Sequence, residues 1–143
     1  MHEGQGEGMT AKEYLSQARN LEHAINNKLA QVEALRNTAT KATTILSGMP
    51  NSPSPNVSRM EDTIAKLVDL ENEAISDMER LVSLQSEIAS VINMLENPVL
   101  IKLLTLRYLC YKDWDSISEE LHYHPNHIYK LHGRALRQVA SKR

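Results

Sequence analysis

Apolar residues recur at alternating intervals of three and four positions through two long stretches of the chain. Between Thr10 and Ser47 the repeating positions, one of them polar, are Tyr14, Ala18, Leu21, Ile25, Lys28, Val32, Leu35, Ala39, Ala42 and Leu46. In the second stretch they are Met60, Ile64, Leu67, Leu70, Ala74, Met78, Leu81, Leu84, Ile88, Val91 and Leu95. Such spacing places one stripe of side chains along a helix. It therefore predicts two long α-helices.

The segment 47–56 between these stretches holds three of the five prolines and predicts the loop that joins the helices. Together they predict an antiparallel, coiled-coil-like helical hairpin over residues 10–96, with Thr10 and Glu13 as a capping box at its start. Residues 1–9 have no apolar periodicity and contain three of the five glycines, so we expect a disordered amino terminus. Two helices alone leave apolar surface uncovered, which favours homo-oligomerisation through the hairpin. The alternative is that both stripes serve only the hairpin.

The pattern breaks at Asn97-Pro98 and restarts as a set of short helices. Asn97 can cap a helix and Pro98 suits its first position, so residues 100–109 predict a short, largely buried helix. After a turn in which Asp113 or Asp115 can cap, residues 116–121 predict a second short helix. A three-residue turn, 122–124, then leads to a last helix that begins at Pro125 and runs toward Val139. Two helices joined by so short a turn have the helix-turn-helix layout, here over residues 98–143.

The apolar positions support this layout. A helix-turn-helix buries two residues of its first helix, one residue after the turn and two residues of its second helix. The residues at these five points are Ile117, Leu121, Tyr123, Ile128 and Leu131, and Trp114 and Leu136 extend the core. Two small residues common in such motifs are replaced, since Ser118 stands where alanine is frequent and His122 where glycine is frequent. We therefore predict an all-helical (all-α) protein with a hairpin followed by a helix-turn-helix module.

Charge changes sign near the same boundary. Residues 1–97 carry a net charge of −6 and residues 98–143 carry +4, and no acidic residue follows His122. A basic module beside an acidic partner segment is the arrangement expected when one end of a chain meets a polyanion. No segment has the length and apolarity of a membrane span or signal peptide, and the single Cys110 is expected to be a buried thiol in a reducing compartment. These features predict a cytoplasmic protein without a membrane partner.

Four of the six histidines lie within residues 122–132. His124 and His127 are spaced for one helix face, but His132 is not, and structural zinc sites usually include cysteine. No carboxylate or nucleophile lies within this stretch to work with an imidazole. We therefore expect no metal site, no cofactor and no catalytic activity.

The polar face of the last helix has the residue types that recognise DNA. In a helix-turn-helix, side chains at the start of the second helix meet base edges in the major groove. The residues predicted to read bases are Pro125, Asn126, Tyr129 and Lys130. Those predicted to contact phosphates are Lys112, His127, Arg134, Arg137, Lys142 and Arg143. The predicted partner is double-stranded DNA.

The stretch RYLCYKDWDSISEELHYHPNHIYKLHGRAL, residues 107–136, resembles the fourth region of primary-type bacterial sigma factors, which reads an upstream promoter element. From Met9 onward, with MTAKEYL, the SGMP linker and LHGRAL, the chain resembles a family of uncharacterised phage and prophage proteins that carry this module. The resemblance implies transcription regulation of phage or prophage genes. Family members have serine where His124 stands, at the cap of the last helix.

Two other functions remain open at this point. Small subunits of phage packaging enzymes also combine a helix-turn-helix with an oligomerising hairpin. The fourth sigma region also docks on RNA polymerase, so the module could bind polymerase as an interaction protein.

Overall fold

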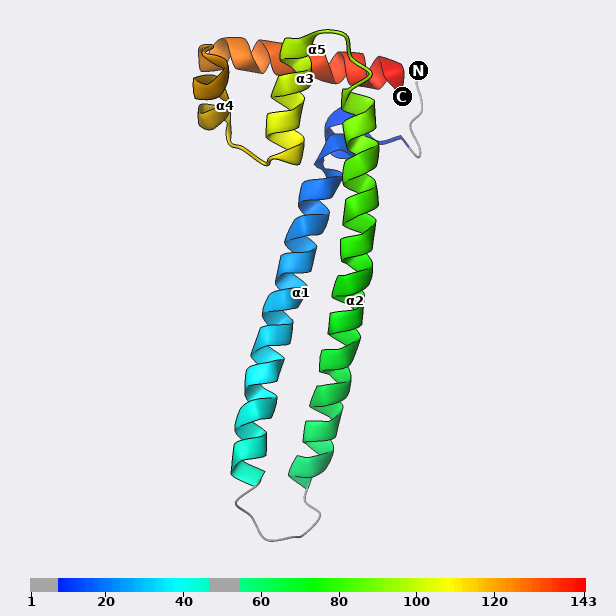
Figure 1. Ribbon diagram of the computed structural model, residues 1–143, viewed down its shortest axis with the longest axis vertical. Helices are drawn as coiled ribbons and strands as arrows, with labels where there is room; N and C mark the ends of the chain where they lie inside the picture. The colour runs from blue at the N-terminus through cyan, green and yellow to red at the C-terminus, as the bar shows by residue number, and fades with distance from the viewer. Residues whose placement is uncertain (1–7, 47–54) are drawn as a thin grey trace. The chain divides into compact units, whose positions relative to one another are not determined.

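The computed structural model describes residues 8–46 and 55–143, and every regular element in these ranges is a helix. The elements are α1 (Ala11–Leu46), α2 (Pro55–Ile92), α3 (Pro98–Leu104), η1 (Thr105–Leu109), α4 (Trp114–Leu121) and α5 (Pro125–Lys142). Helices α1 and α2 pack antiparallel as a long hairpin (Figure 1). The all-α prediction with its helical hairpin is thus confirmed. Residues 1–7 of the predicted disordered terminus and 47–54 of the predicted loop lie outside the described residues.

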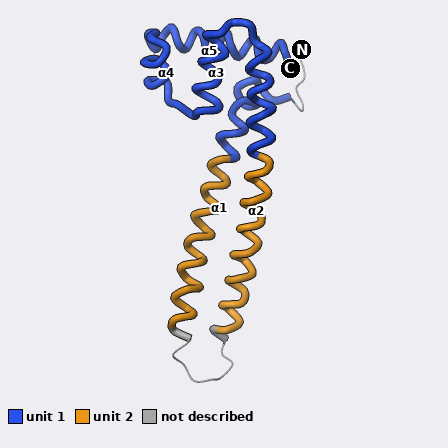
Figure 2. The backbone as a smooth tube through the Cα atoms, in the orientation of Figure 1, with its two compact units in different colours: residues 1–21, 81–143 blue, residues 22–80 orange. Residues whose placement is uncertain are grey.

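The chain divides into two compact units (Figure 2). One unit comprises residues 22–80, which form most of the hairpin. The other comprises residues 1–21 and 81–143, so the first turns of α1 and the last turns of α2 belong with the short helices. The change of charge near residue 97 falls inside this second unit. The two units are named here the hairpin unit (22–80) and the module unit (1–21 and 81–143).

The start and stripe of α1 follow the sequence prediction. Thr10 and Glu13 form the capping box, in which the Glu13 N–H donates to Thr10 Oγ1 at 3.1 Å and the Thr10 N–H donates to Glu13 Oε1 at 2.8 Å. The stripe positions from Tyr14 to Ala42 are all buried or half-buried. The side chain of Leu46, the last predicted position, lies outside the description.

The stripe of α2 departs from the prediction at two positions. Ile64 and Met78, both predicted to face α1, are about two-fifths exposed. The preceding residues take their places: Thr63 is half-buried, and Asp77 is only 8% exposed. The reason at the second position is electrostatic, because Lys28 occupies the facing seam of α1 and needs a carboxylate there.

Lys28 and Asp77 form an ion pair in this seam, with Lys28 Nζ 2.6 Å from Asp77 Oδ2. Glu73 lies 3.4 Å from the same ammonium, and Arg80 lies 3.1 Å from the other oxygen of Asp77. The hydrogen bond between these two side chains raises the pKa of Lys28 and lowers the pKa of Asp77. A polar pair at one seam position fixes which turns of the two helices face each other, because any slip would leave both charges against apolar side chains.

The module unit has a single apolar core. Leu15 of α1 and Ile88 and Ile92 of α2 are fully buried in the same cluster as Leu100 and Leu103 of α3. The described ends of α1 and α2 therefore provide the base on which the short helices pack. Asn97 caps α3 as predicted, since its Oδ1 accepts the Val99 N–H at 2.9 Å.

The helix predicted for residues 100–109 changes character partway. Its second half, η1, is a π-helix that ends at Leu109. Tyr111, two residues further on, is a non-glycine residue with a φ of 61°. The Tyr111 hydroxyl accepts a hydrogen bond from Gln85 Nε2 at 2.9 Å. Cys110 is exposed, so the prediction of a buried thiol was wrong. The wider π-turn explains the error, because the apolar neighbours of Cys110 in sequence do not continue as a regular helix around it.

The ion pair gives a test of the hairpin's register. We expect Lys28→Leu and Asp77→Leu each to lower the free energy of unfolding, because each leaves one partner of the pair without its main counter-charge in the seam. The double variant should be at least as stable as the unaltered protein. The measurement is urea unfolding followed by circular dichroism.

Arg36 and Glu71 form a more exposed ion pair between the same helices and provide the matched control. Arg36→Leu and Glu71→Leu should each change the free energy of unfolding by less than about 0.5 kcal/mol. Equal changes in the free energy of unfolding at the two ion pairs would contradict the conclusion that Lys28 and Asp77 fix the register of the hairpin.

Candidate nucleic-acid interface

The candidate interface is built on α4, the turn after it and α5, all within the module unit. Helix α4 begins at Trp114, two residues before its predicted start, because Asp113 rather than Asp115 is the N-cap. Asp113 Oδ1 accepts the Ser116 N–H at 2.8 Å, and this hydrogen bond lowers the pKa of Asp113. The cap places the first turn of α4 next to the loop from η1.

The turn between α4 and α5 is as tight as a helix-turn-helix requires. His122 adopts the left-handed conformation, with a φ of 61° and a ψ of 41°, in the place where glycine is common. This conformation costs a non-glycine residue about 1–2 kcal/mol. The turn nevertheless stays closed with histidine at this position. The Tyr123 N–H donates to the Ser118 carbonyl at 3.1 Å and holds the turn closed.

His124 is the N-cap of α5. Its Nδ1 accepts the Asn126 N–H at 3.1 Å, and Pro125 occupies the first helical position. An acceptor at Nδ1 requires that this nitrogen carry no proton. The cap therefore involves the imidazole in its neutral form with the proton on Nε2.

Four of the five predicted core points are buried or half-buried. Ile117, Ile128 and Leu131 are buried and Leu121 is half-buried, and the predicted extensions Trp114 and Leu136 pack partly buried against the same core. Tyr123 is the exception, because it is 38% exposed and makes an edge contact with the ring of His127, with centroids 4.9 Å apart. Its prediction as a core residue was wrong: the left-handed turn at His122 directs Tyr123 along the outside of α5.

An aromatic cluster joins η1, α4 and α5. The ring of His132 stacks on Tyr108 with centroids 5.8 Å apart and meets the edge of Trp114 at 4.6 Å. His132 Nε2 lies 2.7 Å from the Tyr108 hydroxyl. Arg107 lies over Trp114, 4.3 Å from the ring centroid, and donates to the Lys112 carbonyl. These contacts fix the orientation of α5 about its own axis.

Burial in this cluster changes two pKa values. It lowers the pKa of His132 to about 4, with a further contribution from the charges of Lys12 and Arg107, and it raises the pKa of Tyr108 to about 12. The neutral imidazole of His132 can therefore accept a hydrogen bond from the Tyr108 hydroxyl. The sequence pattern gave His132 no role, because its spacing from His124 and His127 does not suit one helix face, and this contact was missed. The sequence signal for this role is the position of His132, one residue after the buried Leu131.

The face of α5 opposite its buried side carries the predicted base-reading residues. Asn126, Tyr129 and Lys130 are exposed and Pro125 is half-buried at the start of the helix. Arg137, exposed two turns after Lys130, continues the same face. Gly133 lies between them, where an added Cβ would meet only the Arg137 guanidinium, at 3.6 Å. The middle of this face is therefore open enough for another molecule to approach the helix backbone.

The predicted phosphate-contacting residues are not equivalent in the structure. Arg134, Arg137, His127 and Lys142 are exposed. Lys112 lies 3.6 Å from Glu120 in an ion pair. The Arg143 guanidinium lies 4.3 Å from the centroid of the Tyr14 ring and donates to the Met9 carbonyl. Lys112 and Arg143 thus have partners inside the chain, whereas the arginines of α5 project outward.

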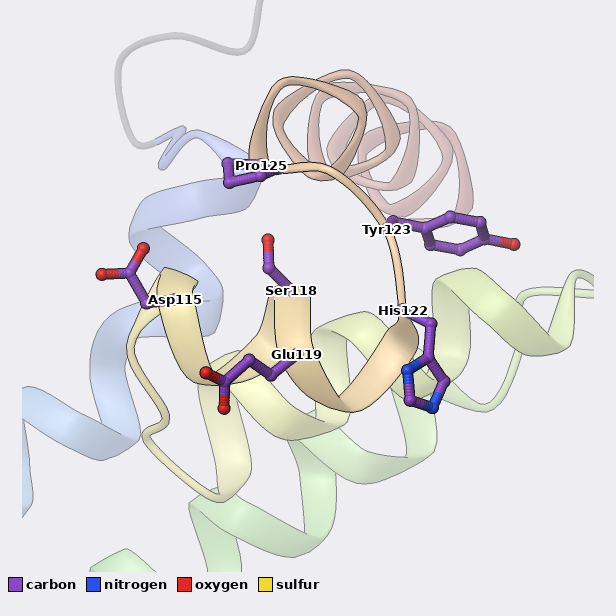
Figure 3. A pocket seen from close by; sticks show the side chains of 6 residues that line it. All are labelled: Asp115, Ser118, Glu119, His122, Tyr123 and Pro125. Atoms are coloured by element: carbon purple, nitrogen blue, oxygen red, sulfur yellow. The ribbon is translucent and has the colours of Figure 1, made fainter.

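A shallow hollow of about 590 Å³ lies beside the turn (Figure 3). It is lined by Asp115, Ser118, Glu119, His122, Tyr123 and Pro125. Figure 3 shows the carboxylates of Asp115 and Glu119 on the α4 side of the hollow, one helical turn apart. The Ser118 hydroxyl is buried and has no hydrogen-bond partner. This side of α4 is acidic, in contrast with the outward face of α5.

Within residues 8–46 and 55–143, no group of three or more histidine, cysteine, aspartate or glutamate side chains is placed to hold a metal ion. Over the same ranges, no helix combines the length and apolarity needed to cross a membrane. Comparison with protein families, curated proteins and solved structures gives no match to this chain.

The lowered pKa of His132 predicts a pH-dependent stability. The unfolded chain takes up a proton at this imidazole near pH 6.5, whereas the folded chain does so only near pH 4. The contribution of His132 to the free energy of unfolding is therefore fully present above about pH 6.5 and is lost as the pH falls toward 4. Between about pH 7 and about pH 5 we expect a loss of about 1–2 kcal/mol in the free energy of unfolding, allowing for solvent screening.

Urea unfolding at both pH values measures this loss, and His132→Phe is the comparison. Phenylalanine keeps a ring between Tyr108 and Trp114 but has no ionisable group. The variant should therefore lose less stability over the same interval. If both proteins show the same pH dependence, His132 is not the responsible group.

The unpartnered hydroxyl of Ser118 predicts a stabilising substitution. Ser118→Ala removes a buried polar group that lacks a hydrogen bond, so the free energy of unfolding should rise by about 1 kcal/mol. Ser90, exposed on α2, is the matched control. Ser90→Ala should gain only the few tenths of a kcal/mol expected from helix propensity. A loss of stability in Ser118→Ala would show that the hydroxyl has a partner.

Proposed function

We propose that this protein is a sequence-specific DNA-binding regulator of transcription, of phage or prophage type. In this proposal α5 enters the major groove and the hairpin holds copies of the chain together. The observation that carries the proposal is the outward face of α5, where exposed hydrogen-bonding and cationic side chains lie together and no carboxylate occurs along the helix.

The chemistry of this face suits base edges near the start of α5. Asn126 has both a donor and an acceptor, which is the pattern that pairs with adenine, and Lys130 can donate to guanine one turn further on. Tyr129 is half exposed and its ring is braced by an edge contact with Trp114 at 5.6 Å. A ring held in this way loses little freedom on binding, so it suits a contact with a base or a thymine methyl group.

The charges further along α5 suit the phosphate backbone. Arg134 and Arg137 project from the middle of the helix, and neither forms an ion pair with another described residue. Free guanidinium groups can neutralise phosphates without first losing a partner. Lys112 and Arg143 would have to give up Glu120 and Tyr14, so we assign them a smaller share of the binding free energy.

The rigidity of the module supports the same function. The His124 cap, the turn at His122 and the aromatic cluster around His132 each restrict α5. A recognition helix that is already oriented loses less conformational entropy on binding, and its side chains meet base edges in a defined register. The resemblance of residues 107–136 to the fourth sigma region agrees with this proposal.

The acidic hollow favours one alternative function. Asp115 and Glu119 are exposed without an ion-pair partner among the described residues, and they would repel a nearby phosphate backbone. A basic protein surface, such as one on RNA polymerase, would suit this side of α4. In that alternative the module is an interaction protein, and it would show no salt-dependent binding to any duplex.

Two substitutions on α5 separate base reading from phosphate contact. Lys130→Ala should relax discrimination at one base pair and cost about 1–3 kcal/mol at the preferred site. Arg137→Ala should weaken binding to all duplexes about equally and reduce the slope of log affinity against log salt by about one. Fluorescence anisotropy over a series of salt concentrations measures both effects.

Lys66, exposed on α2 in the hairpin unit, provides a control for the loss of one positive charge. Lys66→Ala should leave both the affinity and the salt slope nearly unchanged. If Lys130→Ala and Arg137→Ala bind DNA as the unaltered protein does, α5 does not present the binding face.

A further inference from the structure

Glu120 of α4 lies between two lysines that come from different elements of the module unit. Its Oε2 is 3.5 Å from Lys102 Nζ of α3, and its Oε1 is 3.6 Å from Lys112 Nζ in the loop before α4. The three side chains are between 40% and 54% exposed, so another charged molecule can reach them. One carboxylate thus faces two ammonium groups at the surface, and two positive charges against one negative charge leave a net charge of +1.

The two lysines belong to a larger group of charges at the start of α4. The Arg107 guanidinium donates to the Lys112 carbonyl at 3.0 Å. The hydrogen bond that caps α4 lowers the pKa of Asp113, and the charges of Arg107 and Lys112 lower it further. The Asp113 carboxylate is already used by this cap. Among the described residues, Glu120 is therefore the carboxylate that neutralises the lysines directly.

This group of charges adjoins the face of α5 that is proposed to read DNA. Arg107 lies over the ring of Trp114, 4.3 Å from its centroid, and the Trp114 ring meets that of Tyr129 with centroids 5.6 Å apart. Lys112 precedes Trp114 by two residues. Because the major groove is about 12 Å wide, a duplex whose base edges meet Tyr129 has a phosphate backbone within reach of the neighbouring cations.

A phosphate group would compete with Glu120 for the same ammonium groups. Carboxylates and phosphates both present anionic oxygen atoms that accept hydrogen bonds from lysine. Exposed ion pairs are weak, so a phosphate can displace the carboxylate from either lysine. The displaced carboxylate nevertheless stays close by and repels the phosphate that replaces it. Glu120 therefore reduces the free energy that both lysines can contribute to binding DNA.

We propose that Glu120 is an internal counter-anion that limits the contact of Lys102 and Lys112 with the DNA backbone. Its carboxylate occupies the place between the two lysines that a phosphate group would take. This inference rests on the proposed function and deepens it, because it names a residue that sets how much of the affinity comes from phosphate contacts. Such contacts carry no sequence information, so weakening them reduces the occupancy of unrelated DNA.

Glu119, the neighbour of Glu120 on α4, provides the matched control. Both residues are exposed glutamates of one helix, so replacement by glutamine removes the same charge from the same element. Glu119 lines the hollow beside the turn (Figure 3) and forms no ion pair with another described residue. A difference between Glu119→Gln and Glu120→Gln therefore reports the two ion pairs rather than the net charge of the chain.

Fluorescence anisotropy over a series of salt concentrations measures the effect, with one duplex that contains the preferred site and one that lacks it. For Glu120→Gln we expect the affinity for both duplexes to rise about threefold or more at low salt. The slope of log affinity against log salt should steepen by about one for each lysine that then contacts a phosphate. Glu119→Gln should leave the slope unchanged. Adding Lys102→Ala and Lys112→Ala to Glu120→Gln should remove the gain.

Three results would overturn the proposal. Equal effects of Glu119→Gln and Glu120→Gln would assign the gain to net charge alone. Weaker binding by Glu120→Gln would show that the carboxylate positions α4 against α3, and a gain that persists without both lysines would exclude them as its source. If Glu120→Gln does not fold, Glu120→Asp decides instead, because its shorter side chain withdraws the charge from both lysines and should give part of the same rise.

Failure of this inference can be distinguished from failure of the proposed function. If the unaltered protein and every variant bind no duplex in a salt-dependent way, both are refuted. If the unaltered protein prefers one DNA sequence but Glu120→Gln binds as Glu119→Gln does, the proposed function stands and the role of Glu120 is refuted.

Discussion

The burial of one side of α5 is the constraint on which the rest of the module depends. Ile128, Leu131, Ala135 and Val139 lie three or four residues apart and are enclosed where α5 packs on α3 and α4. Once these side chains are inside, Asn126, Lys130 and Arg137 have no position except the outward face. The caps and the turn serve this packing, because they set where α5 begins and at which angle it leaves α4. The candidate interface is thus a consequence of the core rather than a separate feature.

Periodicity predicted the helices and the helix-turn-helix layout because both depend on where apolar side chains recur. It failed where a polar interaction decided the register. Asp77 rather than Met78 faces α1, since Lys28 in the opposing seam requires a counter-charge. Tyr123 is exposed because His122 adopts a left-handed conformation, which alters the direction of the chain after the turn. Neither effect has a signal in the spacing of apolar residues.

The candidate site was partly predictable for the same reason. The outward residues of α5 follow from the positions of its buried ones, so residue types and spacing were sufficient to select them. The partners of Lys112 and Arg143 could not be predicted, because Glu120 and Tyr14 come from other elements and meet them only in the folded unit. His132 was missed because its role depends on Tyr108 and Trp114, which are distant in sequence.

The central claim is that the face of α5 reads the sequence of double-stranded DNA. The most direct measurement is selection of bound molecules from random duplex DNA, carried out at a low and a higher salt concentration. Phosphate contacts weaken as salt rises, whereas base contacts retain their preference. If α5 reads base edges, one enriched motif should persist at the higher salt concentration. Recovery of no enriched motif at either concentration would contradict this claim.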